Sequence, residues 1–154
     1  METWGNTDIL NLPKTAFLRS RKCPANVVLK SYDWAKEQRE AENCIVCGNH
    51  SQIEKDVFDI LLKGKQPLIL VLARGMKTRW EPEIERAVMQ NRLLVISPFD
   101  KTVKRVTRET AEGRNRIILE ISDRIIVGYK TRGGQLDKLL IGKHYEDVWQ
   151  VKSP

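Results

Sequence analysis

The chain has 154 residues, of which 41% are hydrophobic, so it is large enough for one well-buried domain and too small for two ordinary ones. Lys and Arg total 27 against 20 Asp and Glu, and the formal net charge of +7 favours polyanions as partners. No apolar run approaches the roughly 18 residues of a membrane span and the first residues lack signal-peptide features, so we expect a cytoplasmic protein without membrane contact.

Short runs rich in Val, Ile and Leu alternate with longer helical patterns along the chain. This alternation is typical of a parallel sheet covered on both faces. It predicts an α/β fold, a Rossmann-like three-layer sandwich whose mainly parallel sheet is flanked by helices. The expected strands are Thr15–Arg19, Asn43–Cys47, Pro67–Ala73, Arg92–Ser97 and Arg124–Gly128, with a further strand near Tyr145–Val151.

Helical patterns fill the intervals between these strands. The first, Ala25–Ala41, has an apolar face of Val27, Val28, Leu29, Trp34 and Ala35. The others begin at Ser51, which opens a capping-box sequence, at Glu81-Pro82, at Lys101 and after Gly133-Gly134. Residues 1–12 carry no clear pattern, so we expect a loosely ordered segment before a single domain over residues 13–151.

Polar and small residues follow several of the predicted strands. In an open parallel sheet the carboxyl ends of the strands form the ligand-binding edge, and glycine lets backbone approach a phosphate. Tight turns also select glycine and polar residues without any ligand, which is the structural alternative for each segment. The segments are Arg19-Ser20-Arg21-Lys22, Gly48-Asn49-His50-Ser51, Arg74-Gly75-Met76-Lys77 and Thr131-Arg132-Gly133-Gly134.

Cations are concentrated between residues 101 and 116. Two of them, Arg114 and Arg116, directly precede the apolar run Ile117-Ile118-Leu119, so we expect them to lie beside the core and to contact a ligand. A solvated helix face is the alternative for the rest of the stretch. The six cations are Lys101, Lys104, Arg105, Arg108, Arg114 and Arg116, against only Glu109 and Glu112.

Several motifs occur in an order that one known family shares. They are Ser20-Arg21, Cys47-Gly48, Ser97-Pro98-Phe99, Glu112-Gly113-Arg114-Asn115-Arg116-Ile117-Ile118, Ser122-Asp123-Arg124-Ile125-Ile126-Val127 and Gly133-Gly134. Over Thr15–Ile141 this order resembles the Rossmann-like core of the DprA family of DNA-processing proteins, within the SLOG superfamily. The chain has Arg19 where the family usually has a glycine.

The resemblance implies a nucleic-acid-binding domain that grips single-stranded DNA phosphates in a basic pocket, in DNA processing or uptake. It also implies a homodimer and transfer of the strand to a recombinase partner, a role that needs no catalysis. We expect no cofactor and no metal. Together with cations at the strand ends, it gives the expected binding residues. They are Ser20, Arg21, Lys22, Gly48, Arg74, Arg114, Asn115, Arg116, Gly133 and Gly134.

A nucleotide sensor or nucleotide-cleaving enzyme of the SLOG type, using the same pocket, is the alternative function. Relatives that cleave nucleotides carry a Pro-Gly-Gly-x-Gly-Thr-x-x-Glu motif. The chain has Arg132-Gly133-Gly134-Gln135-Leu136-Asp137 instead, without the threonine and the glutamate, which disfavours an enzyme. His50, four residues before Glu54, is a candidate general acid or base, with a turn histidine as the favoured alternative.

The cysteines and tryptophans favour structural roles. An odd number of cysteines, Cys23, Cys44 and Cys47, indicates a reducing compartment. Cys44 and Cys47 are three residues apart in a predicted strand, so they face opposite sides of the sheet and do not form a metal pair. Trp34 is expected in the core, and Trp80 is a candidate for stacking on bases, with packing of its loop as the alternative.

Overall fold

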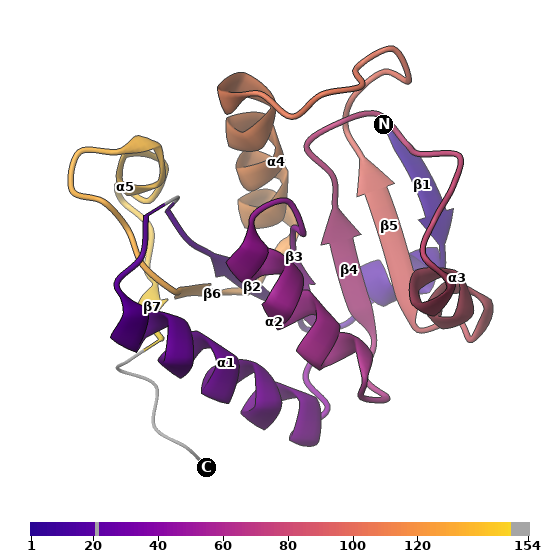
Figure 1. Cartoon of the computed structure of the whole chain (residues 1–154), viewed down its shortest axis with the longest axis horizontal. Helices are drawn as coiled ribbons and strands as arrows, with labels where there is room; N and C mark the ends of the chain where they lie inside the picture. Colours follow the sequence, from indigo (N-terminus) through magenta and orange to yellow (C-terminus); the bar gives the residue numbers. More distant parts are fainter. Residues whose placement is uncertain (21, 149–154) are drawn as a thin grey trace.

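The computed structural model describes residues 1–20 and 22–148, which form a seven-stranded sheet with helices on both faces (Figure 1). The strands are β1 (Glu2–Gly5), β2 (Thr15–Leu18), β3 (Ile45–Cys47), β4 (Leu68–Val71), β5 (Leu93–Ser97), β6 (Arg124–Val127) and β7 (Glu146–Asp147). The helices are α1 (Ala25–Glu40), α2 (Gln52–Leu62), α3 (Pro82–Met89), α4 (Arg108–Ile121) and α5 (Gln135–Leu139), with a 3-10 turn, η1, over Thr7–Asn11. No helix in these described ranges is long and apolar enough to cross a membrane.

The strand order in the sheet is β1-β5-β4-β3-β2-β6-β7. Every neighbouring pair is parallel except β1 and β5, which run antiparallel. From β2 the chain steps outward through β3 and β4 to β5, and α4 then carries it back to the other side of β2. The strand order therefore reverses between β2 and β6, and the expected α/β, Rossmann-like architecture is confirmed.

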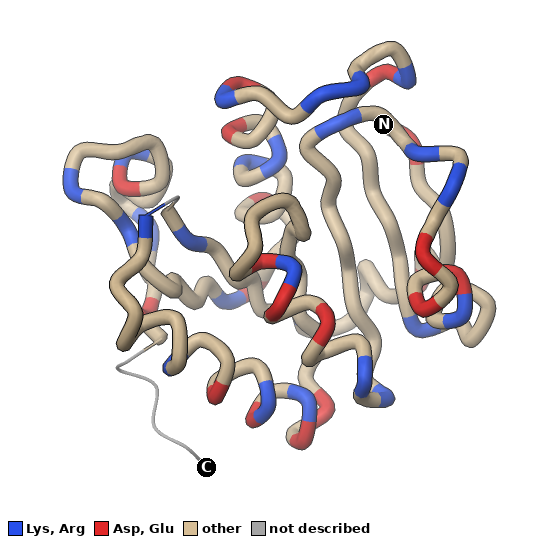
Figure 2. Tube along the Cα trace, in the orientation of Figure 1, with Lys and Arg blue, Asp and Glu red and all other residues tan. Residues whose placement is uncertain are grey.

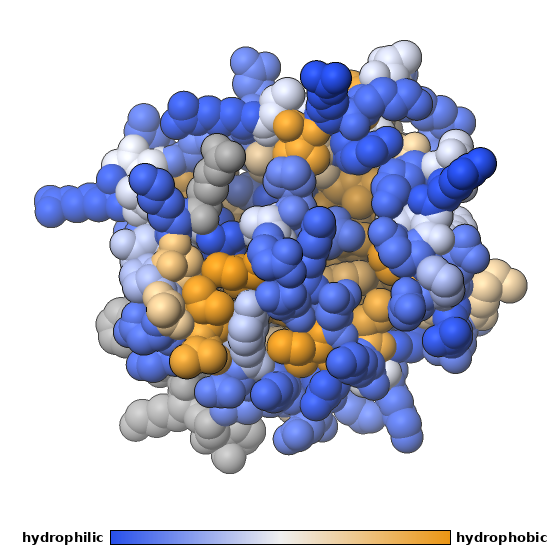
Figure 3. All heavy atoms as spheres, in the orientation of Figure 1, coloured by the Kyte–Doolittle hydropathy of each residue, from blue (hydrophilic) through white to orange (hydrophobic). Residues whose placement is uncertain are grey.

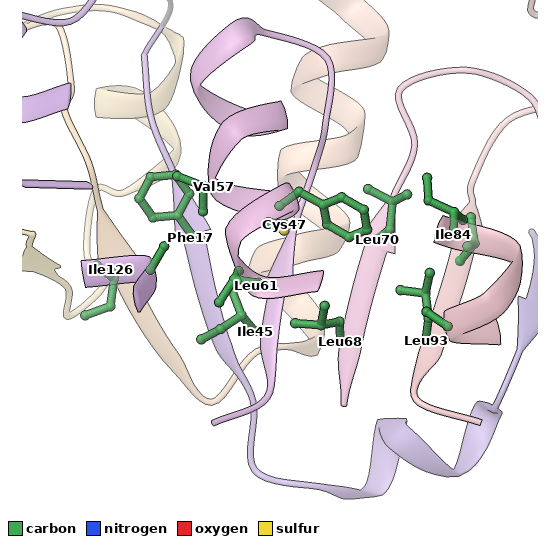
Figure 4. Packing of buried hydrophobic residues seen from close by; sticks show 14 of the residues in the cluster. Phe17, Ile45, Cys47, Val57, Leu61, Leu68, Leu70, Ile84, Leu93 and Ile126 are labelled. Carbon is green, nitrogen blue, oxygen red and sulfur yellow. The ribbon is translucent and has the colours of Figure 1, made fainter. Parts of the chain in front are cut away.

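Hydrophobic side chains on the two faces of the sheet form two separate core clusters. One packs the sheet against α1, α2 and α3, and contains Phe17, Cys47 and Leu61 (Figure 4). The other packs it against η1, α4 and α5, and contains Ile118 and Cys44. Because Cys44 and Cys47 belong to different clusters, the expectation that they face opposite sides of the sheet is confirmed. Burial on both faces also explains why the central strands are nearly continuously apolar.

Helix α1 contacts the sheet through part of its expected apolar face. Trp34 is 3% exposed, as predicted, and its ring stacks on Phe17 with centroids 5.1 Å apart. Val27 and Ala35 are also buried. Leu29 is instead 65% exposed, so its assignment to the core was wrong: it is two residues from Val27, and residues two apart on a helix lie on different faces.

The N-terminal residues belong to the sheet, which differs from the expectation of a loosely ordered segment over residues 1–12. Strand β1 pairs with β5 in the register Glu2 to Ser97 through Gly5 to Leu94. In η1, Ile9 is 2% exposed. The short β1 covers the edge of a strand that would otherwise offer unpaired backbone groups, which is a physical reason for its attachment.

Two other boundaries differ from the sequence-based ones. Helix α4 begins at Arg108 instead of Lys101, because Thr107 and Thr110 form a reciprocal capping box at its N-terminus. Lys101 and Thr102 form a turn, and the residues from Val103 to Thr107 have no regular secondary structure. Each expected strand between Thr15 and Gly128 is present but one to three residues shorter. Of the further strand expected near Tyr145–Val151, the structure has β7 at Glu146–Asp147. Residues 149–151 of that expectation lie outside the described residues.

Candidate functional site

A cleft of about 790 Å³ opens at the carboxyl edge of the sheet, where the chain leaves β2 and β6. The loop after β2, the start of α2, the N-terminal half of α4 and the loop before α5 all line it. Because the strand order reverses between β2 and β6, the following segments diverge to opposite faces and leave a crevice, as in other doubly wound sheets. The topology therefore creates this cleft.

Hydrogen bonds join the segments that follow β2 and β6, next to the cleft. The Thr131 amide donates to the hydroxyl oxygen of Ser20 over 2.9 Å, and the Ser20 amide donates to the Tyr129 carbonyl oxygen over 2.6 Å. The Gly128 amide adds a bond of 2.7 Å to the Leu18 carbonyl oxygen. Ser20, predicted to cradle phosphate, thus also holds the β6 loop against the β2 loop.

Arg114, on the wall of the cleft, is ion-paired. Its Nη1 lies 3.0 Å from Oε2 of Glu54, and the two side chains are only 7% and 12% exposed. Its Nε donates to Oδ1 of Asn115 over 3.2 Å. Glu54 therefore compensates the charge of Arg114 within the protein.

Gly48 makes room for this ion pair. A Cβ at Gly48 would lie 2.3 Å from Nη1 of Arg114 and 2.9 Å from Oε2 of Glu54. The glycine was predicted to let a ligand approach the backbone, but the space next to it is filled by these two side chains. Close packing of an internal pair is the physical reason for a glycine here.

Lys22 and Arg108 are the exposed cations that line the cleft. Neither forms an ion pair with an acid in the described part of the chain. Arg19 also lines the cleft but is 8% exposed, and its Nη1 donates to Oγ of Ser51 over 2.6 Å, at the cap of α2. Figure 2 shows Lys and Arg along the carboxyl edge of the sheet, next to the N-terminal half of α4. The cleft thus contains one neutralised cation, Arg114, and two exposed cations, Lys22 and Arg108, whose charge no described acid compensates.

The predicted binding residues divide into two groups. Ser20, Lys22, Arg114, Asn115 and Gly134 line the cleft together. The others lie elsewhere, or outside the described residues in the case of Arg21. Gly48 is behind Arg114, Arg74 follows β4, Gly133 donates its amide to Asp137, and Arg116 is exposed and pairs with Glu112 at 3.4 Å.

Several lining residues were absent from the predicted set. They include Arg108, Thr131 and Gln135. Arg108 was noted only as one cation of a basic stretch, and the signal that singles it out is the Thr107 capping sequence, which places it in the first turn of α4. Thr131 precedes the two glycines that were chosen instead.

Asp137 orders the loop between β6 and α5. Its carboxylate accepts from Nζ of Lys130 over 2.5 Å and from the Gly133 amide over 2.8 Å. The Lys130 hydrogen bond, followed by that of Gly133, lowers the pKa of Asp137, and the same contact raises the pKa of Lys130. The carboxylate thereby stabilises a loop that contributes Thr131 and Gly134 to the cleft.

The cysteines and Trp80 pack within the protein, whereas His50 lines the cleft. Burial raises the pKa of Cys44 to about 11, and burial also raises the pKa of Cys47, so neither is a reactive thiolate at neutral pH. The His50 amide donates to Glu54 over 3.2 Å. The Trp80 ring packs on Trp4 with centroids 5.2 Å apart, which matches the packing alternative for its loop.

The family assignment rests on nearly the full chain. Residues 2–153 match the model of the family described as DNA recombination-mediator protein A. The chain belongs to this family. A search of curated proteins finds no match to the sequence.

Two solved structures of DNA processing protein A (DprA) share the architecture. The Streptococcus pneumoniae protein is 25% identical with a TM-score of 0.71, over 94% of this chain and 53% of that protein. The Helicobacter pylori protein, whose single-stranded DNA binding mode has been studied structurally, is 17% identical with a TM-score of 0.66, over 87% of this chain and 62% of that one. The chain therefore spans between about half and two thirds of the length of these two structures.

Proposed function

We propose that this DNA recombination-mediator protein A family member binds single-stranded DNA by its phosphates, in the cleft between the β2 and β6 loops. The observation that carries the proposal is the placement of Lys22 and Arg108 at the mouth of the cleft, without a described acidic partner. Phosphate contacts made by Lys and Arg supply most of the affinity of sequence-independent nucleic-acid binding. The single-stranded DNA binding of the Helicobacter pylori relative supports the proposal.

The residues of the cleft have different roles in this proposal. Lys22 and Arg108 attract and contact phosphates. Asn115 and Thr131 line the same cleft and add neutral hydrogen-bonding side chains. Arg114 positions Glu54 and Asn115 and contributes little free charge, because its guanidinium is already paired.

A single nucleotide in the same cleft is the competing ligand. A mononucleotide engages few phosphates, so its affinity depends weakly on salt, whereas a strand releases counterions from each phosphate contact. Formation of a homodimer and transfer of the strand to a recombinase, both implied by the resemblance, stay predictions.

Fluorescence anisotropy of a labelled oligothymidylate tests the proposal at several salt concentrations. For wild type we expect binding whose logarithm falls steeply with the logarithm of salt. The double variant Lys22→Ala, Arg108→Ala should bind more weakly, with a salt slope smaller by about 1.4, since each lost contact to a single strand removes about 0.7. The control Lys36→Ala, Lys65→Ala loses the same charge at exposed positions away from the cleft. Equal losses in the two double variants, or no binding by wild type, would refute the proposal.

A further inference from the structure

Four cations form a second basic surface, which we call the β4–β5 rim. They lie in the loops that follow β4 and β5 at the carboxyl edge of the sheet, and none forms an ion pair with an acid in the described ranges. Neighbouring lysines are compensated: Lys77 pairs with Glu81 at 3.5 Å and Lys101 lies 3.9 Å from Glu2. The members of the rim are Arg74, Arg79, Lys104 and Arg105.

The two loops of the rim are bonded into one unit. The Gly75 amide donates to the Val103 carbonyl oxygen over 2.8 Å, and the Ser97 hydroxyl donates to the Arg74 carbonyl oxygen over 2.7 Å. The backbones approach so closely that a Cβ at Gly75 would lie 2.3 Å from the Asp100 carbonyl oxygen. The cations are therefore displayed on an ordered backbone.

The rim continues into the cleft. The segment after β5 contacts Gly75 through Val103, then carries Lys104 and Arg105, and its next residues, from Val106 to Arg108, line the cleft. Figure 2 shows Lys and Arg along this segment and in the loop after β4, and hydrophilic side chains cover most of the same border in Figure 3. One positively charged surface thus extends along the carboxyl edge.

We propose that a DNA strand held in the cleft continues along the β4–β5 rim, so that the ligand is a polynucleotide and not a mononucleotide. This rests on the proposed function of the cleft. In the sheet order, the midpoint between β2 and β6 lies three strand spacings from the midpoint between β4 and β5. At about 4.8 Å for each spacing, the distance is roughly 14 Å. At about 3.4 Å per stacked nucleotide, the strand reaches the rim after about four nucleotides.

Binding of a short and a long oligothymidylate, of about three and about fifteen nucleotides, separates the rim from the cleft. Affinities and salt slopes are measured by calorimetry for wild type, for Lys104→Ala, Arg105→Ala, and for the control Lys36→Ala, Lys65→Ala. We expect the rim variant to bind the short oligonucleotide like wild type. On the long one it should lose about tenfold or more in affinity and about 1.4 in salt slope, from two lost contacts.

The possible outcomes distinguish the two proposals. If the rim variant and the control bind the long oligonucleotide equally well, or if wild type has the same salt slope for both lengths, the rim proposal is overturned while the cleft proposal stands. If wild type binds neither oligonucleotide, both are overturned. Thermal unfolding of each variant, expected to match wild type because the substituted side chains are exposed, verifies that only surface charge has changed.

Discussion

The guanidinium of Arg114 and the carboxylate of Glu54 form an ion pair of 3.0 Å between α4 and α2, sixty residues apart in the sequence. Burial of both side chains excludes water from the pair and strengthens the attraction. The most prominent arginine of the family-like motif is thus committed to the protein itself. In the proposed function, its effect on DNA binding depends on whether Glu54 neutralises its charge.

Replacement of Glu54 by glutamine tests this relationship. Glu54→Gln keeps the size and a hydrogen-bond acceptor but removes the charge, so Arg114 becomes an uncompensated cation in the cleft. We expect single-stranded DNA to bind roughly tenfold more tightly, equivalent to about 1.4 kcal/mol. The free energy of unfolding should fall by about 1–3 kcal/mol because a charge-assisted hydrogen bond is weakened. Anisotropy and urea unfolding measure the two effects.

Glu112→Gln is the matched control for this substitution. It also removes one negative charge, but from the exposed pair with Arg116, outside the cleft lining. Its DNA affinity should change far less than that of Glu54→Gln. Equal tightening in both variants would show that net charge, and not release of Arg114, is responsible.

Two glycines should respond differently to alanine. At Gly75 the new Cβ meets the Asp100 backbone at 2.3 Å, whereas at Gly48 it meets the end of the Arg114 side chain, which is able to move. We expect Gly75→Ala to lower the free energy of unfolding by about 3 kcal/mol and Gly48→Ala by about 1 kcal/mol. Denaturant unfolding measures both. A larger loss for Gly48→Ala would contradict the packing described for these loops.

Asp137 should make the stability of the cleft loop depend on pH in the acid range. Its folded-state pKa is depressed by Lys130 and Gly133, so its contribution is present above the unfolded pKa of about 3.9 and is lost as pH falls through the folded value. Asp137→Asn should therefore be less stable than wild type at neutral pH, and the difference should shrink below about pH 4. Thermal unfolding across this range measures it. A difference that stays constant with pH would exclude the charged contact as its cause.

Thiol labelling tests the burial of the cysteines. Cys44 and Cys47 are buried on opposite faces, and burial raises both pKa values, whereas Cys23 is partly exposed. Burial also raises the pKa of Cys23, so we expect slow alkylation of this thiol at pH 8 and none of the other two until the protein unfolds. Mass spectrometry after iodoacetamide treatment identifies the site. Rapid native labelling of Cys44 or Cys47 would contradict the two-sided core.

Sequence patterns were sufficient for the central strands and the helices that connect them. Burial on both faces makes β3, β4 and β5 continuously apolar, and such runs stand out in a chain with 31% charged residues. β1 was missed because Glu2–Gly5 has no apolar run and depends on pairing with β5, far away in the sequence. The start of α4 was placed too early because the cations from Lys101 onward are also compatible with a helix, and the capping role of Thr107 was not recognised.

The candidate site was only partly predictable because it too depends on contacts between residues far apart in the sequence. Strand-end position selected Ser20 and Lys22, and both line the same cleft as Arg114. Helix geometry alone separates Arg114 from Arg116, because residues two apart lie on different faces, and this signal was present in the sequence but not used. Compensation of Arg114 by Glu54 is a long-range contact that no local pattern encodes.

The location of bound DNA is the most direct test of the central claim. Backbone amide signals of the isotope-labelled protein, followed by NMR during titration with unlabelled oligothymidylate, report which residues sense the ligand. We predict that the largest shifts occur in the cleft, at Ser20, Thr131 and Gly134. The claim that DNA binds in the cleft would be contradicted if the cleft signals do not move and the largest shifts occur at Phe58 and Ala87, which line the separate cavity between α2 and α3.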